Sequence, residues 1–372
     1  MDFFRPIDIL SIILIIFTLK KWKLDITELF LWITIFVLIF FSSFLGLQVT
    51  NSFDLKNGLG FLYKFFFIYA FKNSLFFIEP DKKQLKIIYN LWYVVYYILM
   101  IWVFIYVYLV SNKLLAGSLR PSFPFSNDYQ YSDAHLYSNY LSLSFIFFHL
   151  TRNFFKFPKI IRLIELILIF PSIFLTGSRN GLLLILLSLP AIIILNYKNM
   201  RYLSKELLYF GAAFIISFIL FLNISGDSSL LIGRTLSFSV DASILGRVTK
   251  FQMAVQEASN SIYLFGVGLF SKQGIWYDGI HSQIIATGGL ISLLIFFLLF
   301  FYYWRGGEKA FRRKKFYYLF SLLLFLYFIS NLITEFALVS RSLIPFLFYI
   351  FILINIEKLE DKRESSDKVN QE

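Results

Sequence analysis

Long apolar runs alternate with short polar stretches along almost the whole chain. Several runs reach the roughly 17–25 residues that a membrane-spanning helix needs. They are continuously apolar, whereas the strands of a membrane barrel alternate apolar and polar residues. The pattern therefore predicts an all-α, polytopic transmembrane helical bundle of about eleven spans, within a range of about 10–12. The runs are Ile7–Leu19, Leu29–Leu47, Leu59–Ile78, Ile87–Val110, Leu136–Leu150, Ile160–Thr176, Leu182–Leu195, Leu207–Leu222, Ile284–Trp304, Phe316–Ile333 and Leu343–Ile354.

The segment Asn223–His281 is the longest polar stretch between two runs. Within it, Gly246–Asn260 spaces apolar residues at helical intervals, which predicts a short amphipathic helix on or near the membrane surface. We expect residues 1–356 to form one transmembrane domain that includes this loop. Residues 357–372 are rich in charge and are expected to form a mobile cytoplasmic tail.

The composition agrees with a membrane protein, because 58% of the residues are hydrophobic and 16% are charged. Such a chain has too few charges to cover a soluble surface of its size. It contains no cysteine, which excludes disulfides, thiolate metal sites and a cysteine nucleophile. No spacing of acids or histidines suggests a metal site, and no Walker-type motif is present.

The basic residues are distributed unevenly between the two sides of the predicted bundle. When alternate loops and the C-terminal tail are assigned to one side, that side holds 23 of the 35 lysines and arginines. Cytoplasmic loops are enriched in these residues, so the C-terminus is expected in the cytoplasm and the loop Asn223–His281 outside. The net charge of +12 is therefore explained by membrane orientation, and we expect no nucleic-acid partner.

His281 is the sharpest candidate for chemistry. It lies at the outer end of the ninth run, beside the long loop, where neutral imidazole could accept a proton from a hydroxyl group. The alternative is an interfacial histidine that only hydrogen-bonds the backbone. That structural interpretation is the one we apply to His135 and His149.

Arginines on the predicted outer side form the second group of candidates. Arginine binds phosphate in a bidentate manner and keeps its charge at any working pH. Arg179 lies in the short turn Thr176–Gly181 between two apolar runs, where helix N-terminal amides could join it in binding an anion. Arg247, Arg234 and Arg120 are further candidates, although single arginines at helix ends often only extend to the lipid headgroups.

Four other polar residues are candidates for a supporting role. Lys64 and Lys72 lie in one predicted span, where a charged side chain either faces the bundle interior or extends to the interface. Glu335 could pair with an outer arginine, for which a structural ion pair is the favoured interpretation. Asn127 follows the Arg120 segment.

Four segments together resemble the bacterial O-antigen polymerase and O-antigen ligase superfamily of membrane proteins. Gly117–Asn127 is similar to an arginine-to-asparagine stretch of that family, and Thr176–Gly181 is similar to its Ser-Arg turn. Gly246-Arg247 followed by Phe265–Gly268 resembles an arginine helix that leads to a Gly-x-Gly turn. Asp278–Ser282 with the later Gly288-Gly289 resembles a His-Asn segment and a glycine turn, with Ser282 in place of the asparagine.

The resemblance implies glycosyl transfer from an undecaprenyl-diphosphate-linked oligosaccharide on the outer leaflet of the bacterial inner membrane. No cofactor, nucleotide sugar or essential metal is expected. His281 would be the general base, and Arg179 and Arg247, helped by Arg234 and Arg120, would hold the diphosphate. The pathway's chain-length regulator and flippase would be partners, and the product would be O-antigen, capsule or exopolysaccharide.

Two alternatives stay open beside a polymerase that transfers the glycan to another lipid-linked repeat unit. One is a ligase that transfers the glycan to lipid A core. The other is a transporter, such as a saccharide-lipid flippase. Transporters are often built from structural repeats with broken midplane helices, whereas here the candidate residues gather on one side.

Overall fold

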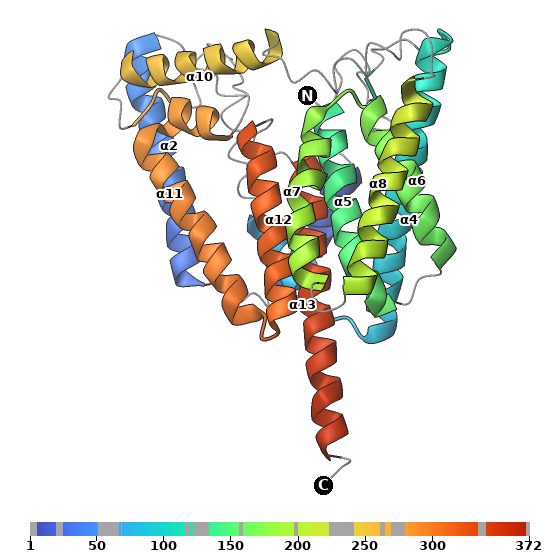
Figure 1. Ribbon diagram of the computed structural model, residues 1–372. Coiled ribbons are helices and arrows are strands. Elements are labelled where there is room, and N and C mark those ends of the chain that lie inside the picture. Colours follow the sequence, from blue (N-terminus) through green and yellow to red (C-terminus); the bar gives the residue numbers. More distant parts are fainter. Residues whose placement is uncertain are drawn as a thin grey trace. The chain divides into compact units, whose positions relative to one another are not determined.

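The computed structural model is helical in every regular element of the residues it describes (Figure 1). The described residues are 6–19, 25–50, 67, 69–115, 120–121, 134–155, 159–196, 200–222, 242–260, 265–268, 280–333 and 340–369. The all-α prediction is confirmed for this part of the chain. Each predicted apolar run falls on a helix, the third run only in part within the described residues.

The helix boundaries follow the apolar runs closely, and most helices extend a few residues beyond them. Residues 69–76 are helical as well. The named helices are α1 (Pro6–Thr18), α2 (Ile26–Thr50), α4 (Lys82–Ser111), α5 (Ala134–Phe155), α6 (Lys159–Leu175), α7 (Arg179–Asn196), α8 (Met200–Leu222), α10 (Ala242–Asn260), α11 (Ile280–Ala310), α12 (Lys314–Ile333) and α13 (Ser340–Val369).

Three of the described helices are long and apolar enough to cross a membrane. Their apolar segments are Ile26–Phe44, Lys82–Ser111 and His281–Ala310. Other apolar segments, such as Leu163–Leu175 and Leu207–Ile219, are shorter than a membrane span requires. The helices therefore support membrane association, but the predicted number of about eleven spans is not confirmed.

Helix α4 shows the distribution of side chains expected next to lipid. Its exposed side chains form an aliphatic stripe, and its buried face carries tyrosines. A soluble helix has the opposite arrangement, with polar side chains outward. The stripe is Ile87, Leu91, Val94, Ile98, Ile101 and Ile105, and the buried tyrosines are Tyr89, Tyr93, Tyr96 and Tyr106.

The chain forms two compact units, each assembled from three stretches of sequence. Unit 1 comprises Met1–Glu79, Val240–Arg312 and Asn331–Ile354. Unit 2 comprises Pro80–Ser239, Arg313–Ser330 and Asn355–Glu372. Helices α12 and α13 each contribute residues to both units. Neighbouring segments in sequence, such as α8 and α10, therefore belong to different units.

Helix α5 is the core helix of unit 2, since its residues from Leu136 to His149 are all buried. It packs closely on α7 through small residues. A Cβ atom added at Gly181 would lie 1.9 Å from Ser138 Oγ, and Ser142 Oγ donates to the Gly181 carbonyl at 2.9 Å. Polar side chains lower the hydropathy of α5, so this predicted span is not among the described helices that are apolar enough to cross a membrane, although it is deeply buried.

In unit 1, α2 and α11 run side by side and α10 lies across their ends (Figure 1). Helix α11 is broken at Gly289, whose φ of 66° and ψ of −168° are not helical. The amides of Val267 and Gly268 donate to the Ala286 and Thr287 carbonyls at 2.8 and 2.9 Å. The Gly-Val-Gly turn thus bonds carbonyls in the last turn before the break, where the helix cannot supply its usual donors.

The amphipathic helix predicted at Gly246–Asn260 is present as α10, which begins four residues earlier at Ala242. Helix α13 continues through the charged tail to Val369, and the mobility of that tail stays a prediction. Glu357 is buried and accepts a hydrogen bond from the Arg313 amide at 3.0 Å. The Arg313 guanidinium also forms an ion pair with Glu360. These contacts within unit 2 anchor the first turn of the charged segment.

Candidate functional site

Arg179 is the first residue of α7, directly after the turn that the sequence predicts. Gly177 has a φ of 60°, a left-handed conformation that glycine adopts without a steric penalty. The Ser178 amide donates to Thr176 Oγ1 at 3.2 Å. The turn is buried, whereas the Arg179 side chain is half-buried. A guanidinium group and the amides of a helix N-terminus therefore lie together, which suits an anion.

Arg120 joins this turn although it lies far from it in sequence. Its Nε donates to the Thr176 carbonyl at 3.4 Å, and its Nη2 lies 3.4 Å from His135 Nε2. His135 Nδ1 in turn lies 3.0 Å from Ser178 Oγ. Unit 2 thus brings the Arg120 segment and the Ser-Arg turn to the same point.

His135 is the residue that sequence reasoning missed. It was assigned a structural role, because nothing in its local sequence separates it from His149. Its position at the second residue of α5, shortly after the Arg120 segment, was the available signal. His149 lies near the other end of α5, where its Nδ1 is 3.1 Å from Arg152 Nη1.

In unit 1, His281 lies at the start of the apolar segment of α11 and is half-buried. Its ring contacts Phe251 of α10, with ring centroids 5.3 Å apart. Arg247 lies one helical turn before Phe251 on α10. The next two residues of α11, Ser282 and Gln283, are buried. The helix that carries Arg247 therefore packs against the residue proposed as the base.

The candidates fall into two pairs, one in each unit. Arg120 and Arg179 belong to unit 2, and Arg247 and His281 belong to unit 1. Of the other candidates, Lys72 lies in unit 1, and Arg234, Asn127, Glu335 and Lys64 lie outside the described residues.

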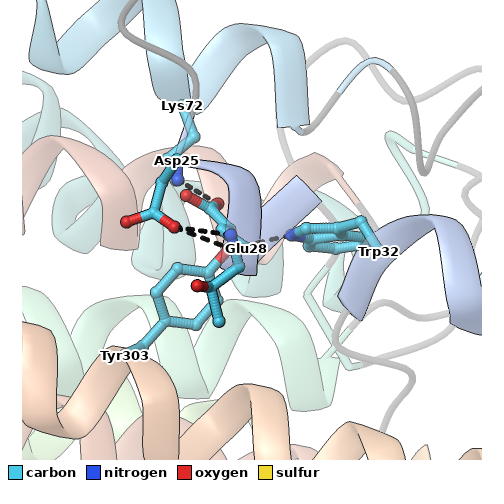
Figure 2. A network of polar contacts seen from close by, with 6 residues as sticks. Asp25, Glu28, Trp32, Lys72 and Tyr303 are labelled. Carbon is cyan, nitrogen blue, oxygen red and sulfur yellow. Dashed lines mark hydrogen bonds and ion pairs between the residues drawn. The ribbon is translucent and has the colours of Figure 1, made fainter. Parts of the chain in front are cut away.

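Lys72 takes part in a network of polar contacts in unit 1 (Figure 2). Its ammonium group forms a buried ion pair with Glu28, near the start of α2. The same Glu28 oxygen accepts a hydrogen bond from Tyr303 Oη at 2.6 Å, and Trp32 Nε1 donates to Tyr303 Oη at 3.0 Å. The ammonium also lies 5.6 Å from the Tyr69 ring centroid, a distance typical of a cation–π contact.

This network lies at the opposite end of α11 from His281. Tyr303 follows the break at Gly289 by 14 positions, which corresponds to about 21 Å along the helix after the break, whereas His281 lies before it. Lys72 therefore has a partner that ties three segments together, and it does not share a site with His281.

Asp25 precedes α2 and caps it. Its Oδ1 accepts hydrogen bonds from the amides of Thr27 and Glu28 at 2.9 and 3.1 Å. A hydrogen bond from Tyr302, together with the bond from the Glu28 amide, holds the pKa of Asp25 below its ordinary value. The hydrogen bonds from Tyr302 to Asp25 and from Tyr303 to Glu28 join the first turn of α2 to the last part of α11, and the ion pair joins that turn to the Lys72 segment.

Among the residues that the structure describes, no group of three or more histidines and acids is arranged to hold a metal ion. The arrangement offers guanidinium groups, imidazoles and a helix N-terminus. Such groups can bind an anion and move a proton.

Comparison of the chain with protein-family models, with curated proteins and with solved structures found no match.

Proposed function

We propose that this protein is an oligosaccharide repeat-unit polymerase of a bacterial inner membrane. It transfers a growing glycan from undecaprenyl diphosphate to a hydroxyl group of another lipid-linked repeat unit, on the outer face. One observation carries the proposal: the four segments of the family resemblance meet in pairs. The Arg120 segment contacts the Ser-Arg turn at Thr176, and His135, which lies beside Arg120, contacts Ser178 of the same turn. The Gly-Val-Gly turn bonds Ala286 and Thr287, five and six residues after His281 on α11.

In the proposed reaction the acceptor oxygen forms a bond to the anomeric carbon of the donor glycan. The bond between that carbon and the diphosphate oxygen breaks, and the acceptor proton passes to His281. By the family resemblance, Arg179 and Arg247, helped by Arg120 and Arg234, would bind the diphosphate and stabilise the charge that develops on it. A diphosphate is already a good leaving group, so positioned positive charge and one base are sufficient chemistry.

The protein is tested as purified, in lipid nanodiscs, with lipid-linked repeat units as the single substrate. We expect longer glycans to form without nucleotide sugar and in the presence of a chelator. His281→Ala should lower the transfer rate by roughly 10²–10⁴-fold, the usual contribution of a general base, and leave donor binding intact. His149→Ala is the matched control and should transfer at the wild-type rate.

Other outcomes point to the alternatives. Transfer to lipid A core, without extension of repeat units, would identify a ligase. Movement of lipid-linked units across a bilayer, with no longer product, would refute the polymerase proposal in favour of a flippase. Extension that survives His281→Ala unchanged would keep the enzyme and remove its proposed base.

A further inference from the structure

The contacts of His135 determine which of its nitrogens carries the proton. A guanidinium group has five N–H donors and no acceptor. His135 Nε2, which lies 3.4 Å from Arg120 Nη2, must therefore accept the hydrogen bond. The proton of the neutral ring is then on Nδ1, which donates to Ser178 Oγ at 3.0 Å.

These contacts orient Arg120 beside the start of α7. The guanidinium is fixed at two points, since its Nε donates to the Thr176 carbonyl and its Nη2 donates to His135. Ser178 immediately precedes Arg179. The imidazole is thus a link between the Arg120 guanidinium and the residue before the helix N-terminus. Orientation by such supporting groups is what allows a binding side chain to meet its ligand in one geometry.

We propose that His135 is a positioning residue for Arg120, neutral with its proton on Nδ1, and that protonation of its ring releases Arg120 and weakens diphosphate binding. The identity of the anion rests on the proposed function. The tautomer and the contact with Arg120 do not depend on it.

Protonation breaks this link for two reasons. A protonated imidazole has two donors and no acceptor, so it cannot bind a guanidinium. It would also place a second cation 3.4 Å from Arg120. Arg179, the residue after Ser178, is a further basic group beside this link.

The tautomer can be measured without any ligand. The chain has three histidines, so ¹⁵N-histidine spectra of the protein in nanodiscs can be assigned with one substitution per residue. We expect His135 to carry its proton on Nδ1. His149 is the internal control and should show the opposite tautomer, because its Nδ1 is the atom that meets Arg152. A proton on Nε2 of His135, or a spectrum unchanged by Arg120→Met, would overturn the inference.

The effect of His135 protonation on diphosphate binding is tested by measuring the affinity of the protein for a probe. The probe is undecaprenyl diphosphate that carries one N-acetylglucosamine. The experiment uses a His281→Ala background, which removes the other candidate histidine. Between about pH 7.5 and about pH 5.5, the range in which histidines titrate, we expect the affinity to fall roughly tenfold. His135→Gln keeps an acceptor for Arg120 and should abolish this pH dependence. His135→Asn is too short to reach Arg120 and should bind weakly at both pH values.

His149→Gln is the matched control and should follow the pH dependence of the parent protein. If His135→Gln loses affinity in acid as the parent does, or if His135→Asn binds like the parent, the inference is overturned. If the parent protein does not bind the probe at any pH, the proposed function fails. In that case the tautomer measurement still decides the role of His135.

Discussion

At the scale of single residues, arginines provide the charge and imidazoles provide the proton chemistry of the proposed site. Arg179 begins α7, and Arg120 reaches the same turn from a distant part of the chain. A guanidinium group can bind two phosphate oxygens at once, whereas a lysine ammonium acts as a single point charge. The choice of arginine at these positions is therefore open to a direct test.

Arg179→Lys and Arg247→Lys keep the positive charge and remove the bidentate fork. If both residues grip the diphosphate, each variant should lose about tenfold or more in donor affinity, as expected when charge-assisted hydrogen bonds are lost. The measurement is binding of the lipid-linked donor at constant salt concentration. Arg152→Lys, at the other end of α5, is the control and should bind normally. Wild-type binding by both Arg179→Lys and Arg247→Lys would leave only an anchoring role for these arginines.

At the scale of elements, two features of unit 1 hold α2 against neighbouring segments. The Lys72–Glu28 ion pair is nearly dry, with side-chain exposures of 12% and 7%. The Gly-Val-Gly turn inserts between the broken part of α11 and Ser43 of α2. The first feature depends on charge and the second on the absence of a side chain, so each can be tested separately.

Lys72→Met should destabilise the protein by about 3–5 kcal/mol, because it leaves the Glu28 carboxylate buried without its cation. The double variant Lys72→Met with Glu28→Gln should recover most of that loss, since the glutamine oxygen can still accept from Tyr303. Stability is measured by reversible unfolding in detergent. Lys82→Met, at an exposed position, is the control. A double variant as unstable as the single one would contradict the ion-pair account.

Gly268→Ala should destabilise unit 1, because the added Cβ would lie 2.2 Å from the Ser43 Cα atom and φ is 79°. Neither the backbone at Gly268 nor the backbone at Ser43 can move easily, so we expect the free energy of unfolding to fall by at least roughly 1–3 kcal/mol. Gly211→Ala on α8 is the matched control, since a Cβ there meets nothing within 4 Å. It should stabilise the helix slightly. Equal melting temperatures for the two variants would show that the turn is not tightly packed.

At the scale of the whole molecule, the proposal depends on the orientation of the chain in its membrane. The aliphatic stripe on α4 and the three membrane-length helices in the described part of the chain support a lipid environment. The uneven distribution of basic residues predicts that the long loop is external and that the segment Arg305–Lys315 is cytoplasmic. This orientation can be tested by labelling single introduced cysteines, because the chain contains no cysteine of its own.

Single cysteines introduced at Lys272 and at Lys309 should therefore differ in labelling. We expect a membrane-impermeant maleimide to label Lys272→Cys in intact spheroplasts and to label Lys309→Cys only after the membrane is opened. Each variant is also labelled in detergent as a control for reactivity. Labelling of Lys309→Cys in intact cells would invert the orientation and place the long loop on the cytoplasmic side, away from the proposed substrate.

The sequence by itself determined the helical class, the positions of the helices and the turn before Arg179. These features are local, since apolar periodicity and glycine placement depend on neighbouring residues. It also located the amphipathic helix α10 to within four residues. The number of about eleven spans stays a prediction, because several of the apolar runs, such as that of α5, are shorter or more polar than a spanning helix requires.

Only the tertiary structure decided which distant residues meet. It gave Lys72 a carboxylate partner 44 positions away, and it placed His135 between Arg120 and Ser178. It also continued α13 into the charged segment, where Arg313 binds Glu357 and Glu360. Such contacts join residues that are far apart along the chain. The pattern along a single helix carries no information about them, because they arise when helices pack against one another.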